Sequence, residues 1–138
     1  MNAFVKNAQS VGAGDALVFD GMNYASNGCW CRSGGWLFAP QATGQFTITK
    51  PGVYRILFTA QAQVAAAGVI EMEIRNAGAG IPGTQMAENA AVADAPHTMA
   101  AACEIVVPCG GNAHITVTNT GAEEITVTAA SLVIDRIG

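Results

Sequence analysis

The chain has 138 residues and a formal net charge of −4, with 51% hydrophobic and only 12% charged residues. This length suits one domain with a sizeable core, and the apolar composition excludes disorder as the main state. Six Lys and Arg against ten Asp and Glu argue against a nucleic-acid partner. No apolar stretch approaches the roughly 18 residues of a membrane-spanning helix, and the first residues lack the apolar run of a signal peptide. We therefore expect a protein made in the cytoplasm with no membrane partner.

The shortage of charge is itself informative. A free monomeric domain usually carries about 25% charged residues, roughly twice the fraction found here. We interpret the shortage as a sign that other chains cover part of the surface. A monomer with a surface of Ser, Thr, Gln and Asn is the alternative.

Hydrophobic residues recur mainly with a period of two, which predicts β-strands. The stretch 86–102 is rich in helix-favouring Ala, but Pro96 interrupts it and no helical stripe is present, so we expect a loop that runs into a strand. The expected strands cover 15–20, 36–39, 45–49, 53–63, 69–75, 98–107, 114–119 and 125–137. Turn residues every 8–15 positions between such strands are typical of an all-β, antiparallel two-sheet sandwich. We expect one domain over 13–138, preceded by an anchor or pairing segment over 1–12.

Two of these strands carry apolar residues on both faces. Leu57 lies on the otherwise polar face of 53–63. In the last strand, Val133 is on one face, and Leu132 and Ile134 are on the other. Only one face of a sheet meets the core of a sandwich, so the second face needs cover from another layer. A neighbouring copy of the chain is the simplest candidate.

The segment 44–61, GQFTITKPGVYRILFTAQ, resembles the signature of the tumour-necrosis-factor/complement-globular-head superfamily. That signature combines a Gly-x-Phe-Thr strand, a Pro-Gly turn and a Gly-Val-Tyr-x-x-x-Phe strand. The stretches LVFD at 17–20, VIEMEIRN at 69–76 and ASLVIDRI at 130–137 look like further strands of the family. Among members of the superfamily, the sequence is most similar in character to small bacterial and phage members, including the C-terminal domains of collagen-like spore-surface proteins. No collagen-like stalk accompanies the resemblance.

The resemblance implies a jelly roll of about ten strands that assembles as a threefold homotrimer, with the outward face of its inner sheet on the axis. The residues that it implies for the core are Tyr54, Ile56, Phe58, Ile115, Val117, Leu132 and Ile134. The residues that it implies for the trimer interface are Arg55, Leu57, Thr59, Gln61, His114, Thr116, Ser131 and Val133.

The four cysteines do not form a metal-site pattern. Cys29 and Cys31 are too close in sequence for an unstrained bridge, and an extended chain separates Cys103 from Cys109 by up to roughly 20 Å. Neither spacing matches the Cys-x2-4-Cys pairs of a zinc site. We expect Cys103 to be a small buried residue, and a bridge from Cys29 or Cys31 to Cys109 stays open.

No catalytic constellation emerges, and we expect no enzyme activity, metal or cofactor. His97 and His114 lack the His-x-His pair of a metal-binding jelly-roll enzyme, and no nucleophile elbow or phosphate loop is present. Glu71 and Glu73 share one strand face, which we expect to point at water. An ion held by three copies of His114 on the axis is an alternative to a hydrogen-bonded histidine at a strand end.

The loop 21–35 contains Tyr24, Trp30 and Arg32, the residue types that dominate recognition surfaces. Its aromatic residues could instead fold back on the sandwich. Our first hypothesis is a non-enzymatic, homotrimeric structural or display module of a phage virion (decoration, head fibre or tail appendage) or of a bacterial spore or cell surface. Residues 1–12 would join it to a larger assembly or pair within it. The alternative is an adhesin that binds a host receptor or glycan through the loop.

Overall fold

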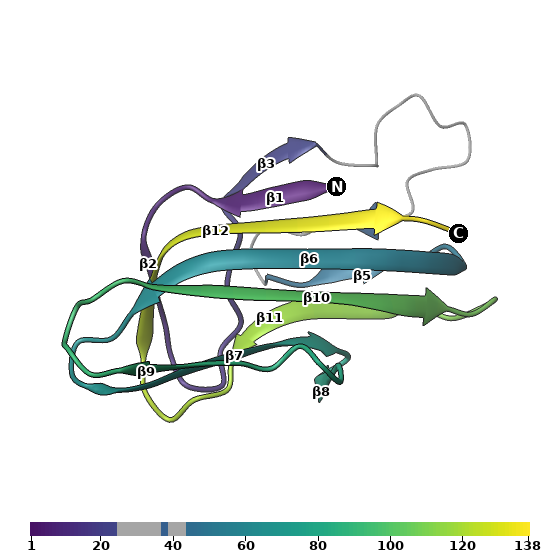
Figure 1. Cartoon of the computed structure of the whole chain (residues 1–138). Helices are drawn as coiled ribbons and strands as arrows, with labels where there is room; N and C mark the ends of the chain where they lie inside the picture. Colours follow the sequence, from purple (N-terminus) through teal and green to yellow (C-terminus); the bar gives the residue numbers. More distant parts are fainter. Residues whose placement is uncertain (25–36, 39–43) are drawn as a thin grey trace.

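The computed structural model describes residues 1–24, 37–38 and 44–138, which form two antiparallel sheets. The first, called the β6 sheet, has the order β10-β6-β12-β1-β3, with β2 also paired to β12. Its strands are β1 (Asn2–Val5), β2 (Gln9–Val11), β3 (Gly21–Tyr24), β6 (Gly52–Gln63), β10 (His97–Val107) and β12 (Ile125–Arg136). Figure 1 shows the long strands β10, β6 and β12 running side by side.

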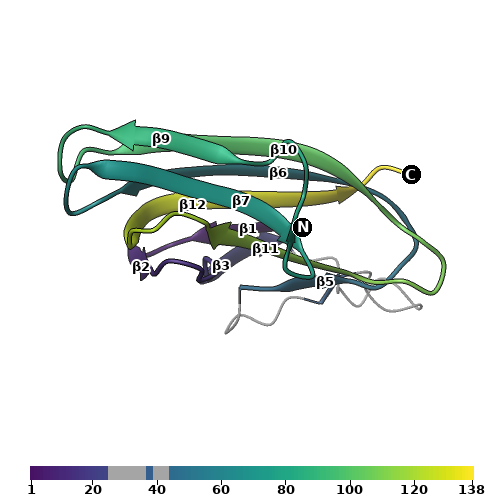
Figure 2. The ribbon, with the colours of Figure 1, turned by 90° about the horizontal axis from the view of Figure 1, so that it is seen from below.

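The second sheet, called the β7 sheet, has the order β4-β5-β11-β7-β8, with β9 also paired to β7. Its strands are β4 (Leu37–Phe38), β5 (Phe46–Ile48), β7 (Gly68–Asn76), β8 (Ala79–Gly80), β9 (Met86–Ala90) and β11 (Ala113–Asn119). Figure 2 shows β9 alongside β10 at one edge of the molecule, where the two sheets approach each other. The predicted all-β, two-sheet antiparallel sandwich is confirmed.

The core lies between the sheets and follows the predicted alternation. Every second residue of β6, from Tyr54 to Ala62, is buried, and the residues between them are exposed or half-buried. The seven predicted core residues are each at most 1% exposed, namely Tyr54, Ile56, Phe58, Ile115, Val117, Leu132 and Ile134. Burial of each large side chain stabilises the fold by about 1.5–3 kcal/mol.

The stretch 15–20 is not the strand that its alternation predicts. Leu17 and Phe19 are buried as expected, but the only ladder contact of this stretch is a bridge between Ala16 and Thr118. The side-chain amide of Gln9 donates to the Val18 carbonyl and accepts from the Val18 N–H. One side chain therefore satisfies the backbone groups that a neighbouring strand would otherwise pair.

Two further segments form strands: one was expected to be a loop, and the other was expected to be an anchor or a pairing segment. Residues 86–90, expected as loop, form the strand β9, because they pair with β7 in continuous register from Gly68 to Met72. Residues 1–12 contribute β1 and β2, and both strands pair with β12.

Thr84 bridges a gap in the edge of the β7 sheet. On the edge of β7 away from β11, β9 pairs with β7 as far as Met72 and β8 pairs only with Arg75 and Asn76, so no strand pairs with Ile74 on that edge. The fully buried Thr84 hydroxyl contacts the Ile74 N–H at 3.2 Å and the Ile74 carbonyl at 3.1 Å. The Ile81 carbonyl lies 2.7 Å from the same hydroxyl.

Replacing this hydroxyl should destabilise the fold. We expect Thr84→Val, which preserves the shape, to lower the free energy of unfolding by about 1–3 kcal/mol, because the Ile74 N–H is left buried without a partner. Urea unfolding followed by circular dichroism measures the change. Thr126→Val on β12 is the control, since the described residues offer the Thr126 hydroxyl no hydrogen bond to lose. Equal stabilities for Thr84→Val and the unmodified chain would contradict this role.

Candidate functional site

The outer face of the β6 sheet, meaning the face turned away from the core, is the candidate assembly surface. Direct cross-strand partners share a face, so the register places the exposed residues in rows. Leu57 lies between Ala102 of β10 and Val133 of β12. Thr59 lies between Ala100 and Ser131 in the next row. Phe4 extends that second row on β1.

This face gathers apolar side chains that water still reaches. Leu57 is 38% exposed, Val106 73% and Ile137 46%, and they are three of the five exposed large hydrophobic residues in the described part of the chain. Val106 is paired with Val53, whose carbonyl accepts the Ile137 N–H. The row of Glu104, Arg55 and Asp135 separates Val106 and Ile137 from Leu57, so these groups form two patches, and the one around Leu57 and Val133 is called the apolar band. Exposed apolar groups of this kind mark an interaction surface.

Charge is confined to one row of the face. Arg55 lies between Glu104 and Asp135, and its guanidinium is 3.4 Å from the Asp135 carboxylate. Both partners are more than 40% exposed, so the pair contributes at most about 1 kcal/mol to stability. The next three rows, which follow β6 from Leu57 to Gln61, contain only uncharged residues, namely Asn2, Phe4, Leu57, Thr59, Gln61, Thr98, Ala100, Ala102, Ala129, Ser131 and Val133.

The face is hollow at its uncharged end. Small residues line a depression of about 420 Å³, beside a β-bulge between Val127 and Ala129 of β12. Its lining consists of Val5, Thr59, Ala60, Gln61, Thr98, Ala129, Ala130 and Ser131. The surface therefore offers bulky apolar groups at one end and a recess at the other.

The strand β10 forms one edge of the β6 sheet, and it lacks the usual protection of an edge. It pairs with β6 over eleven residues without a bulge and contains no proline and only one charged residue, Glu104. Its inward side chains Ala101, Cys103 and Ile105 are only half-buried, because the opposite layer does not cover them fully. Burial raises the pKa of the Cys103 thiol above its ordinary value.

Six of the eight predicted interface residues lie on the outer face of the β6 sheet, on β6 and β12. His114 and Thr116 do not join them, because β11 belongs to the β7 sheet. The sequence-based placement of these two residues on the same surface is therefore wrong. His114 Nδ1 lies 3.2 Å from Thr47 Oγ1 and 3.3 Å from Gln45 Nε2. This placement does not suit an ion shared by three copies of His114 on an axis along the β6 sheet.

The other predicted residues are only partly described. Tyr24 ends β3, whereas Trp30, Arg32, Cys29 and Cys31 lie outside the described residues. Cys103 and Cys109 are both free thiols.

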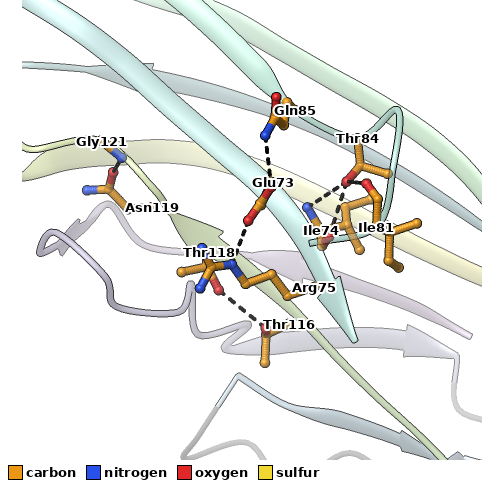
Figure 3. A network of polar contacts seen from close by, with 10 residues as sticks. All are labelled: Glu73, Ile74, Arg75, Ile81, Thr84, Gln85, Thr116, Thr118, Asn119 and Gly121. Carbon is orange, nitrogen blue, oxygen red and sulfur yellow. Dashed lines mark hydrogen bonds and ion pairs between the residues drawn. The ribbon is translucent and has the colours of Figure 1, made fainter. Parts of the chain in front are cut away.

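A second candidate site, which is polar, lies on the outward face of the β7 sheet, where the sequence predicted none. Glu73 was expected to point at water, yet it is only 7% exposed. Its Oε1 accepts the Nε–H of Arg75 at 2.7 Å, and Gln85 Nε2 lies 3.5 Å from its Oε2 (Figure 3). A Cβ on Gly80 would come within 2.5 Å of Oε2, so the chain reversal that carries Gly80 covers the carboxylate.

Glu73 lies on the floor of a trough of about 280 Å³. The lining residues are Glu71, Met72, Glu73, Arg75, Gln85, Met86, Ala87 and Thr120. The alternation of Glu71, Glu73 and Arg75 shows which face of β7 they share, but no sequence signal shows that residues 80–85 run along the edge of β7 beside Glu73 and Ile74.

Over the described ranges 1–24, 37–38 and 44–138, no group of three or more His, Cys, Asp or Glu side chains could hold a metal ion. Within the same ranges no helix is long and apolar enough to cross a membrane.

Comparison with known proteins supports the fold assignment. No family model and no curated protein matches the chain. Among solved structures, the globular domain of zebrafish complement 1qA is similar with a TM-score of 0.65 and 12% identity, covering 99% of this chain and 95% of that one. The Eiger tumour necrosis factor of S. frugiperda is similar with a TM-score of 0.65 and 14% identity, covering 100% and 92%. The chain thus has the jelly-roll fold of complement C1q globular domains and tumour necrosis factors.

Proposed function

We propose that the chain is a non-enzymatic structural module that assembles as a homotrimer through the outer face of the β6 sheet. The observation that carries this proposal is the apolar band around Leu57 and Val133, which lies on a sheet whose other face already forms the core. Covering such a band removes apolar surface from water, at roughly 25 cal/mol per Å². The likeness of the fold to the tumour-necrosis-factor superfamily supports three copies.

The edge of β10 is the surface that we propose to meet this face. A face that binds a different surface of the next copy makes a head-to-tail contact, and such contacts close into a ring of three when each copy is rotated by about 120° from the last. The half-buried Ala101, Cys103 and Ile105 and the long unpaired edge both gain cover in this arrangement. The recess near Thr59 and Ser131 gives room for a protruding group of the neighbour.

The setting that we propose is a phage virion or a bacterial spore or cell surface, where the trimer would serve as a decoration or display module. This part of the proposal rests on the resemblance of the segment 44–61 to small bacterial and phage members of the superfamily. We propose a pairing role for residues 1–12, because β1 and β2 are hydrogen-bonded to β12. The adhesin alternative depends on the loop 21–35 with Tyr24, Trp30 and Arg32, of which only Tyr24 lies among the described residues.

A charge placed in the apolar band should dissociate the assembly. We expect Leu57→Arg to give monomers, because three guanidinium groups would be forced into an apolar interface. Val69→Arg is the matched control, since Val69 is a 46% exposed strand residue on the outward face of β7, in the other sheet. Native mass spectrometry should find trimers for the control and monomers for Leu57→Arg, with folding of both checked by circular dichroism. Trimers for both variants would contradict the interface.

The thiol of Cys103 offers an independent probe of the β10 edge. In a chain with Cys29, Cys31 and Cys109 replaced by Ser, we expect Cys103 to react slowly with a maleimide near neutral pH. The raised pKa keeps the thiol protonated, and the neighbouring copy covers it. Adding Leu57→Arg should speed the reaction by roughly tenfold by uncovering the edge.

The rate should also rise with pH in both proteins, because only the thiolate reacts. Identical rates with and without Leu57→Arg, in proteins that differ in mass, would show that the edge is not part of the interface.

A further inference from the structure

The trough over β7 lies on the side of the sandwich opposite the proposed trimer interface. Its floor is formed by the outward side chains of β7, with Thr120 on one wall and Gln85 and Ala87 on the other. A ligand in this trough would be bound by one copy, so the site is independent of the assembly state.

Glu73 is held in place before any ligand arrives. Its carboxylate is fixed by Arg75 at 2.7 Å and contacts Gln85 (Figure 3). The same carboxylate lies beside Gly80, where even a methyl group would collide with it. A carboxylate that is more than nine-tenths buried is costly to desolvate unless it is paired and hydrogen-bonded. Each carboxylate oxygen can accept more than one hydrogen bond, so Glu73 keeps acceptor capacity toward the trough.

The trough combines acceptors with unused donors. Glu71 and Glu73 supply carboxylate oxygens. Within the described part of the chain, Arg75 donates only through Nε, to Glu73, which leaves the terminal nitrogens of its guanidinium for a ligand. The Thr120 hydroxyl has no hydrogen-bond partner among the described residues and lines the wall.

This mixture selects the chemistry of the ligand. Glu71 and Glu73 repel an anion. Arg75 already occupies Oε1 of Glu73, the oxygen that a metal ion or an ammonium group would need beside Oε2. Hydroxyl groups both donate and accept, and planar carboxylate and guanidinium groups can each bind two neighbouring hydroxyls. The volume of about 280 Å³ lies near the lower end of small-molecule pockets, which suits one sugar ring.

We propose that the trough formed by Glu71, Glu73, Arg75, Gln85 and Thr120 is a binding site for one unit of a neutral saccharide. Glu73 and Arg75 position the ring, and the wall groups fix its orientation.

The test is a titration of the ¹⁵N-labelled protein with the methyl glycosides of glucose, galactose, mannose and N-acetylglucosamine. We expect at least one glycoside to shift the amide signals of Glu71–Arg75 and Thr120 saturably. Thr120→Val removes a wall hydroxyl without breaking any described hydrogen bond, and it should weaken binding by roughly fivefold to tenfold. Thr126→Val, on the other sheet, is the matched control and should bind as the unmodified chain does.

Glu73→Gln, which keeps the shape but exchanges an acceptor for a donor, should abolish binding if thermal melting shows that it remains folded. The proposal is overturned if no glycoside shifts these amides, or if Thr120→Val and Thr126→Val bind equally well. It is also overturned if spermidine or inorganic phosphate, and none of the sugars, binds in the trough. None of these results depends on the oligomeric state, which the mass measurement on Leu57→Arg tests separately.

Discussion

The β6 sheet has apolar side chains on both faces, and the architecture provides cover for only one of them. Tyr54, Ile56 and Phe58 fill the space between the sheets, while Leu57 and its neighbour Val133 look outward from the same ladder. A period of two forces this arrangement, because a strand cannot turn one apolar residue inward without turning its neighbours outward. The need to cover the second face is what connects this fold to assembly.

The two outward faces of the sandwich have different chemistry. On the β6 sheet, charge is confined to the row of Glu104, Arg55 and Asp135, and three uncharged rows follow. On the β7 sheet, charged and hydroxyl side chains dominate, and one carboxylate is buried in the outward layer. The first face suits contact with another copy of the chain, and the second suits a polar ligand. The proposed assembly and the proposed binding would thus use opposite sides of one module.

Most of the fold could be predicted from the sequence, because the core of a sandwich follows local alternation. The predictions that failed concern features that depend on contacts between residues distant in sequence. Gln9 replaces a strand beside Val18, and the chain around Gly80 buries Glu73; neither leaves a periodic signal. His114 alternates correctly along its own strand, but alternation cannot tell to which of two sheets a strand belongs. The rows of the candidate assembly surface likewise required the register between β10, β6 and β12.

The most direct measurement of the central claim is the molar mass of the unmodified protein by light scattering over a range of concentrations. The account predicts three times the chain mass of 14.1 kDa, unchanged by reductant because hydrophobic burial rather than a disulfide joins the copies. A mass of one chain at every concentration, with Leu57 and Val133 open to solvent, would contradict it.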